Sequence, residues 1–152
     1  MNGNEVTSPS PIQNAVVDVH PVLNLNGRGI NLVVFHPTTG QVIFAQAYDN
    51  WAHGNRACAQ LVEDLSAFDD GSVVSLAFKD EGSNTTPELQ AMIASCGGIA
   101  TARKQSRSSW AMIGVKGRMS PGEANEQYNA NGDPVTAKYC SYARVSMPCQ
   151  KS

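Results

Sequence analysis

Arg28 is the residue whose type and setting point most directly to chemistry, because a glycine flanks it on each side in Gly27-Arg28-Gly29. Glycine allows a sharp backbone turn or the close approach of a ligand, and a guanidinium offers planar recognition of oxygen-rich groups through several donors. We therefore take Arg28 as a candidate ligand contact. The alternative is an ordinary surface arginine at the entry to a strand, since most arginines lie at protein surfaces.

Groups that often perform catalysis lack a catalytic arrangement in this chain. The three histidines are scattered, without metal-ligand spacing and without a neighbouring cysteine or serine nucleophile motif. Asp49 with Asp80 or Glu81 is the one carboxylate combination of the glycosidase type, but the sequence does not fix the distance between them. We therefore expect a protein that is not an enzyme, and we assign it no metal and no cofactor.

Composition narrows the class of protein. The 152 residues suit one domain, with 41% hydrophobic residues, only 16% charged residues and a net charge of −2. Such a polar but uncharged surface is common in extracellular and virion-exposed modules, and that is the location we expect, although no signal peptide is visible. The absence of a basic run argues against a nucleic-acid partner, and no apolar stretch approaches the roughly 20 residues that a membrane-spanning helix needs.

The four cysteines are candidates for disulfide bonds. An even set allows three pairings, and none of the spacings is that of a C-x-x-C zinc or redox site. The alternative is a set of buried thiols in a reducing compartment, because unpaired cysteine is among the most buried residue types. The candidates are Cys58, Cys96, Cys140 and Cys149.

The first part of the chain predicts a flexible lead-in followed by strands. Residues 1–11 are rich in Asn, Gly, Ser and Pro, and we expect the folded part to begin near Ile12. Valines between 16 and 22 suggest an edge strand interrupted by Pro21. Apolar runs at 30–35 and 42–44 flank the turn residues 37–40, which is typical of a β-hairpin.

The later part alternates helices and strands. Apolar residues recur at helical spacing over 55–67, and Thr86-Pro87-Glu88 begins a second helix that ends at Gly97-Gly98. A Thr cap, a Pro in the first turn and a Glu at the positive end of the dipole all favour that start. Apolar runs at 72–78 and 110–117 and alternation over 139–147 predict strands. Together these elements indicate an α+β or mixed α/β domain with helices packed on sheets.

Several motifs, taken in order, resemble the interleukin-like EMT inducer (ILEI/PANDER) domain family. The resemblance runs from about Gly27 to Gly117, and the order of the motifs is more specific than any one of them. The matching segments are Gly27-Arg28-Gly29-Ile30-Asn31, Thr38-Thr39-Gly40, Lys79-Asp80-Glu81-Gly82, Cys96-Gly97-Gly98, and residues 107–117 from Arg107 through Trp110 to Gly117.

The resemblance implies a fold and a domain plan. The expected fold is a compact β-β-α globule of two antiparallel sheets with flanking helices. Residues 12–152 would form a single domain of this type, with an irregular C-terminal tail from about residue 118. The family includes small secreted cytokine-like proteins, domains of phage tail proteins, and the sugar-binding stem domain of protein O-mannose N-acetylglucosaminyltransferase.

The resemblance also implies a binding site. In the sugar-binding stem domain two arginines and an aspartate hold a terminal sugar, and their positions fall on Arg28, Asp80 and Arg107 of this sequence. Trp110 is the candidate platform for the apolar face of the sugar ring. The alternatives are that Trp110 is a core residue at the start of a buried strand, and that Asp80 only forms a turn or an ion pair with one of the arginines.

We therefore expect a lectin-like module that recognises a terminal sugar, such as an N-acetylhexosamine, on a glycan partner. Binding to one sugar is weak, so several copies are expected to act together, in a homo-oligomer or within a larger multidomain protein. Two alternatives stay open. One is a secreted cytokine-like or protein-interaction domain, and the other is a receptor-binding or structural domain of a phage tail or virion protein.

Overall fold

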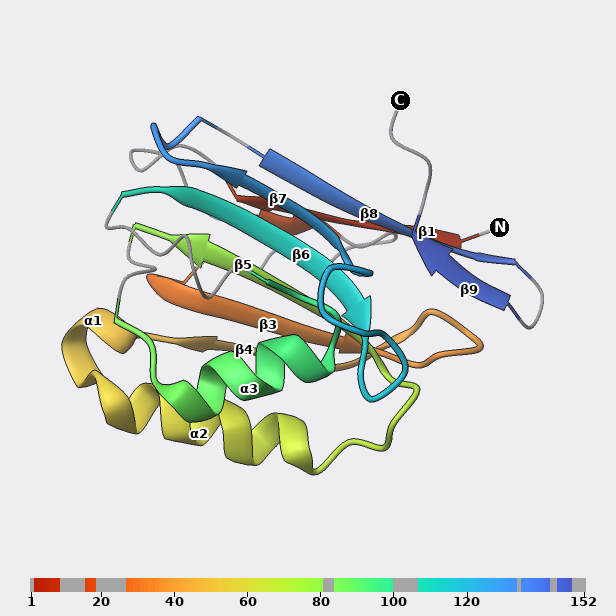
Figure 1. Ribbon diagram of the computed structural model, residues 1–152, viewed down its shortest axis with the longest axis horizontal. Helices are drawn as coiled ribbons and strands as arrows, with labels where there is room; N and C mark the ends of the chain where they lie inside the picture. The colour runs from red at the N-terminus through yellow and green to blue at the C-terminus, as the bar shows by residue number, and fades with distance from the viewer. Residues whose placement is uncertain are drawn as a thin grey trace.

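The computed structural model describes residues 2–8, 16–18, 27–80, 84–99, 107–133, 135–142 and 145–148. Its centre is a five-stranded antiparallel sheet in the order β4-β3-β5-β6-β7 (Figure 1). Strands β3 and β6 are buried along their whole length, which explains their continuous apolar sequences. The five strands are β3 (Gly29–Phe35), β4 (Val42–Tyr48), β5 (Val73–Lys79), β6 (Ser109–Val115) and β7 (Asn125–Asn129).

Helices cover one face of this sheet (Figure 1). Leu61, Leu65 and Leu89 project from them and are fully buried in one apolar cluster, together with sheet residues such as Leu76 and Trp110. Removal of these side chains from water holds the helices on the sheet. The helices in the described part of the chain are α1 (Asn50–His53), α2 (Asn55–Ser66) and α3 (Pro87–Ser95).

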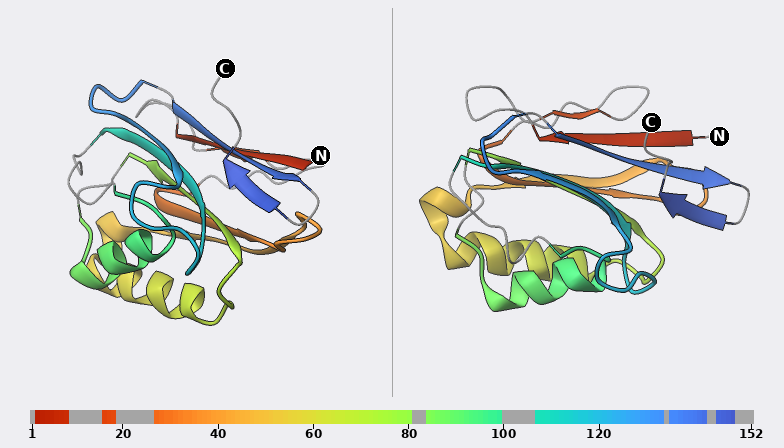
Figure 2. Two further views of the ribbon diagram at one scale, coloured as in Figure 1. Left: turned by 45° about the vertical axis from the view of Figure 1, so that its right-hand side comes forward. Right: turned by 45° about the horizontal axis from the view of Figure 1, so that its top comes forward.

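Four further strands lie across the opposite face of the central sheet (Figure 2). Ala137 belongs to a second apolar cluster with Val33, Ala111 and Ile113, whose side chains leave the sheet on the side away from the helices. The strands pair in the order β2-β1-β8-β9. They are β1 (Asn2–Ser8), β2 (Val16–Asp18), β8 (Val135–Tyr142) and β9 (Val145–Pro148).

The predicted fold class is confirmed at its coarser level. The chain is an α+β protein built on one five-stranded antiparallel sheet with three helices among its described residues. The finer expectation, two antiparallel sheets flanked by helices, needs correction, because α1, α2 and α3 all lie on the central sheet (Figure 2). The apolar faces of α2 and α3 are buried in one cluster with residues of the central sheet, so these helices cover one face of that sheet.

Both predicted helices are confirmed as α2 and α3. Thr86 caps α3, since its Oγ1 accepts a hydrogen bond from the Leu89 N–H at 3.2 Å. Gly97 then adopts φ 96°, the left-handed conformation that commonly ends a helix. The sequence gives no sign of α1, because a helix of four residues is too short to show periodicity.

The structure also corrects the two terminal predictions. The expected flexible lead-in contains β1, and the expected irregular tail from about residue 118 contains β7, β8 and β9. Strands β1 and β8 pair along their whole length. The strand predicted over 139–147 corresponds to β8 and β9. Strands β1 and β7 are polar and are held by partners far away in the sequence, so no local apolar pattern marks them. Pro21 lies outside the described residues.

The predicted disulfides do not appear in the described part of the chain. The Sγ of Cys58 lies 3.4 Å from the Asn84 carbonyl oxygen and donates a hydrogen bond to it. Cys96 is an unpaired, buried thiol, and burial raises its pKa to about 11. The thiol of Cys140 and all of Cys149 lie outside the described residues, so their pairing stays a prediction.

Gly114 tests the packing of α3 against the sheet. A Cβ at this position would lie 2.0 Å from the Cys96 carbonyl oxygen at the end of α3. We expect Gly114→Ala to lower the free energy of unfolding by about 1–3 kcal/mol, as for other overpacked sites, in urea unfolding monitored by circular dichroism. Arg118→Ala is the control and should leave stability unchanged, because Arg118 is exposed beyond the end of β6. Equal stability of Gly114→Ala and wild type would contradict this packing.

Candidate functional site

Four charged residues stand at the ends of four neighbouring strands. Asp49 follows β4, Arg28 precedes β3, Asp80 follows β5 and Arg107 lies just before β6. Because these strands pair in antiparallel register, the four positions meet at one edge of the sheet in the order Asp49, Arg28, Asp80, Arg107. Adjacent strands are about 4.8 Å apart, so the positions span about 14 Å. We call these four residues the strand-end row, and its charges alternate in sign.

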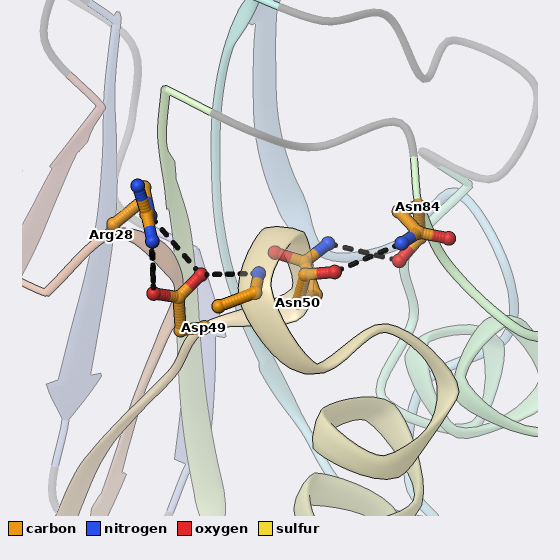
Figure 3. Close-up of polar contacts among 5 residues, drawn as sticks. Arg28, Asp49, Asn50 and Asn84 are labelled. Carbon is orange, nitrogen blue, oxygen red and sulfur yellow. Dashed lines mark hydrogen bonds and ion pairs between the residues drawn. The ribbon is translucent and has the colours of Figure 1, made fainter.

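Arg28 and Asp49 form the strongest contact in the strand-end row (Figure 3). The Arg28 Nη2 lies 2.8 Å from Asp49 Oδ2, and its Nε lies 3.1 Å from both carboxylate oxygens. Asp49 Oδ1 also accepts the Ala52 N–H at 3.0 Å and so caps α1. The guanidinium lies over the Trp51 ring, 4.5 Å from its centroid.

This ion pair changes the proton affinity of both groups. Hydrogen bonds from Arg28 hold the pKa of Asp49 below its ordinary value. The hydrogen bonds to Asp49 in turn raise the pKa of Arg28, and the negative charge of Asp80 adds a smaller contribution in the same direction. The field of Asp80 therefore reaches Arg28, as their neighbouring positions in the strand-end row require.

Asp80 and Arg107 have an unusual backbone. Their φ angles are 66° and 63°, and among the described residues they are the only positive values outside glycine. The two residues are joined directly, because the Arg107 N–H donates a hydrogen bond to the Asp80 carbonyl oxygen at 3.2 Å. Strain of this kind persists where the surrounding structure enforces it, and it clusters at functional sites.

The glycines around Arg28 have a structural purpose. A Cβ at Gly27 would lie 2.2 Å from the Ala47 Cβ, and one at Gly29 would lie 2.1 Å from the Tyr48 carbonyl oxygen. Both glycines therefore allow the end of β4 to pack closely against this segment. From the sequence alone, a sharp turn or the approach of a ligand were the two explanations for these glycines. Their small size brings Asp49 within reach of Arg28.

A pair of asparagines holds the residues just before α3 against the start of α1 (Figure 3). The Asn50 Nδ2 donates to the Asn84 carbonyl oxygen and the Asn84 Nδ2 donates to the Asn50 carbonyl oxygen, each at 2.9 Å. Asn50 is fully buried, and its Oδ1 faces the position that a Cβ at Gly29 would take. This clamp connects the segment that carries Asp49 with residues 84–86, which lead into α3.

The structure thus brings three of the four sequence-predicted site residues together, and it separates the fourth. Trp110 is fully buried, donates from Nε1 to Glu126 Oε2 at 2.7 Å, and packs on Phe78 with ring centroids 4.4 Å apart. It is therefore a core residue and not a platform, because no face of its ring reaches solvent. A ligand role for Arg28, Asp80 and Arg107 stays a prediction.

Sequence analysis did not assign Asp49 and Trp51 to this site. Trp51 is 63% exposed, the largest value among the large hydrophobic residues of the described chain. The available signal was Asp49 directly after an apolar strand, where it could cap a helix and place the next turn beside the sheet end. Arg28 forms its ion pair with Asp49 and not with Asp80. Both carboxylates are available, because β3 lies between β4, which ends before Asp49, and β5, which ends before Asp80.

A cavity of about 510 Å³ lies between β4 and α2, and its lining includes Gln46, Asp49, His53 and Arg56. The described residues hold no cluster of three or more histidine, cysteine, aspartate or glutamate side chains that would suit a metal ion. No helix in that part of the chain is both long and apolar enough to cross a bilayer.

The Arg28–Asp49 pair predicts a shifted titration. Asp49 has a lower pKa in the folded than in the unfolded chain, so the pair contributes stability above the unfolded value, and this contribution is lost as pH falls through the folded value. We expect Arg28→Gln to raise the pKa of Asp49, measured by NMR titration of its carboxyl carbon. Arg118→Gln is the charge-matched control. An Asp49 pKa that is the same in wild type and Arg28→Gln would refute the contact.

Comparison with known proteins connects this geometry to a family. The model of the family "Interleukin-like EMT inducer" matches residues 28–118, which contain the whole strand-end row. Protein FAM3C of Rattus norvegicus is 31% identical over 125 residues, covering 82% of this chain and 53% of that protein. Protein FAM3D of Homo sapiens is 30% identical over 120 residues, covering 78% and 51%.

Protein FAM3A of Homo sapiens is 26% identical over 92 residues, covering 60% of this chain and 39% of that protein. The chain thus spans about half the length of the FAM3C and FAM3D relatives that it matches. The matched residues include the central strands β3, β4, β5 and β6 and all three helices, so the similarity lies in the part of the fold that builds the site. This protein belongs to the interleukin-like EMT inducer family.

Proposed function

We propose that this protein is an extracellular recognition domain that acts by binding a ligand at the strand-end row and not by catalysis. The observation that carries the proposal is the strained Asp80–Arg107 pair beside the Arg28–Asp49 ion pair. A main chain held in one conformation at a surface needs little ordering when a ligand binds, which favours recognition. An extracellular setting agrees with the secreted members of the family that the sequence resembles.

The ligand that we propose is a terminal sugar of a glycan. Hydroxyl and N-acetyl groups need both donors and acceptors, and the strand-end row alternates guanidinium with carboxylate. The Arg28 contacts to Asp49 use Nε and Nη2, which leaves Nη1 for a ligand. Trp51, and not Trp110, offers an exposed aromatic surface at this edge.

A protein partner is the second candidate, and two observations favour it. The family description is that of an interleukin-like protein. The cavity between β4 and α2 runs beside the edge strand of the central sheet, where an extended peptide can lie against a strand and a helix. Asp49 of its lining binds Arg28, which lies over Trp51, and arginine and tryptophan are among the residue types that most often carry binding energy in protein interfaces.

A glycan array tests the sugar proposal with Arg107→Gly and Arg118→Gly. Glycine suits the left-handed backbone at position 107, so this variant removes the guanidinium without adding strain. Loss of one charge-assisted contact is expected to weaken sugar binding at least about tenfold. Arg118 is exposed beyond the other end of β6, so Arg118→Gly should bind as wild type does. Unchanged binding by Arg107→Gly would rule out this use of the strand-end row.

Binding to cultured cells distinguishes the two candidates. The labelled protein is applied to cells before and after enzymatic removal of surface glycans, together with Arg56→Glu, which reverses a charge in the cavity lining. A sugar ligand predicts that deglycosylation abolishes binding to the cells. A protein partner predicts that binding survives deglycosylation and falls in Arg56→Glu, because the reversed charge meets the partner directly.

A further inference from the structure

The charge balance of the strand-end row determines which ligands it admits. Asp49 and Asp80 carry one negative charge each and stand on either side of Arg28, while Arg107 ends the row. The four formal charges sum to zero. Arg28 is already matched to a carboxylate at 2.8 Å, so an anionic ligand that approached it would also meet the charge of Asp49.

We propose that Asp49 is a specificity-determining residue, which makes the site selective for neutral sugars against sulfated, sialylated or other acidic ones. This inference rests on the proposed function. Asp49 acts by holding Arg28 and by cancelling its charge. A neutral hydroxyl or amide can still accept from Arg28 Nη1, because the bonds to Asp49 come from Nε and Nη2.

The geometry argues against a merely structural role for the negative charge. As the cap of α1, Asp49 needs only an oxygen acceptor for the Ala52 N–H, and Asn is as good a capping residue as Asp. The carboxylate is therefore not needed to begin α1. The carboxylate adds a contact of both its oxygens with the guanidinium. This ion pair is partly exposed: 41% of the Arg28 side chain and 30% of the Asp49 side chain reach solvent.

The variant Asp49→Asn separates these two roles. It retains an acceptor for the cap and removes one negative charge, so that the strand-end row carries a net positive charge. An anionic group can then make a charge-assisted contact with Arg28. We expect the ratio of affinities for a sulfated over an unsulfated sugar to rise at least about tenfold.

The experiment compares two probes on one array, N-acetylglucosamine and its 6-O-sulfated form. Wild type should prefer the neutral sugar, and Asp49→Asn should shift the preference toward the sulfated one. This gain should fade at high salt, because salt screens the contact between the exposed Arg28 and the sulfate group. Asp69→Asn is the matched control, since Asp69 is exposed before β5 at the opposite end of that strand from Asp80. It should retain the wild-type ratio.

The outcomes distinguish this inference from the proposed function. If wild type binds the neutral sugar and Asp49→Asn has the same ratio, Asp49 does not determine specificity, while the sugar site stands. A wild-type preference for the sulfated sugar would also overturn the inference. If wild type binds neither probe nor any other glycan on the array, the proposed sugar function fails and the inference fails with it.

Discussion

The close approach of β4 to the two glycines that flank Arg28 is the constraint on which the site depends. A side chain at Gly27 or Gly29 would overlap Ala47 or the Tyr48 carbonyl. Without that approach, Asp49 could not reach the guanidinium with both oxygens and cap α1 at the same time. The Gly-Arg-Gly motif is therefore first a packing motif, and its arginine is presented because the backbone on either side is pressed against β4.

The rest of the site is built from backbone contacts between segments that are distant in the sequence. The Asn50–Asn84 clamp ties the start of α1 to the segment before α3, and the Arg107 N–H binds the Asp80 carbonyl at the neighbouring strand ends. The positive φ angles of Asp80 and Arg107 show that these ends are forced into place. The main chain at these strand ends is therefore held in one conformation, so it needs little ordering when a ligand arrives.

Much of the central fold was predictable because its signals are local. Helices α2 and α3 follow from apolar periodicity and from a Thr-Pro-Glu start, and the buried strands follow from continuous apolar runs. Strands β1 and β7 were missed, since hydrogen bonds to distant strands hold them and their own residues are largely polar, whereas alternation over 139–147 predicted a strand where β8 and β9 lie. Trp110 shows the same limit, because a tryptophan at the start of a strand fits a platform or a core. Only its full burial and its packing on Phe78 decide between them.

By itself, the sequence determined which side chains are available: a glycine-flanked arginine, a second arginine and an aspartate within a pattern that resembles one family. Only the tertiary structure decided that these residues share one edge, that Asp49 and Trp51 join Arg28 there, and that Trp110 does not. The physical reason is the strand order β4-β3-β5-β6, which places segments from four parts of the chain side by side through non-local hydrogen bonds. No local pattern records that order, because each strand can pair with several others until the apolar faces are packed.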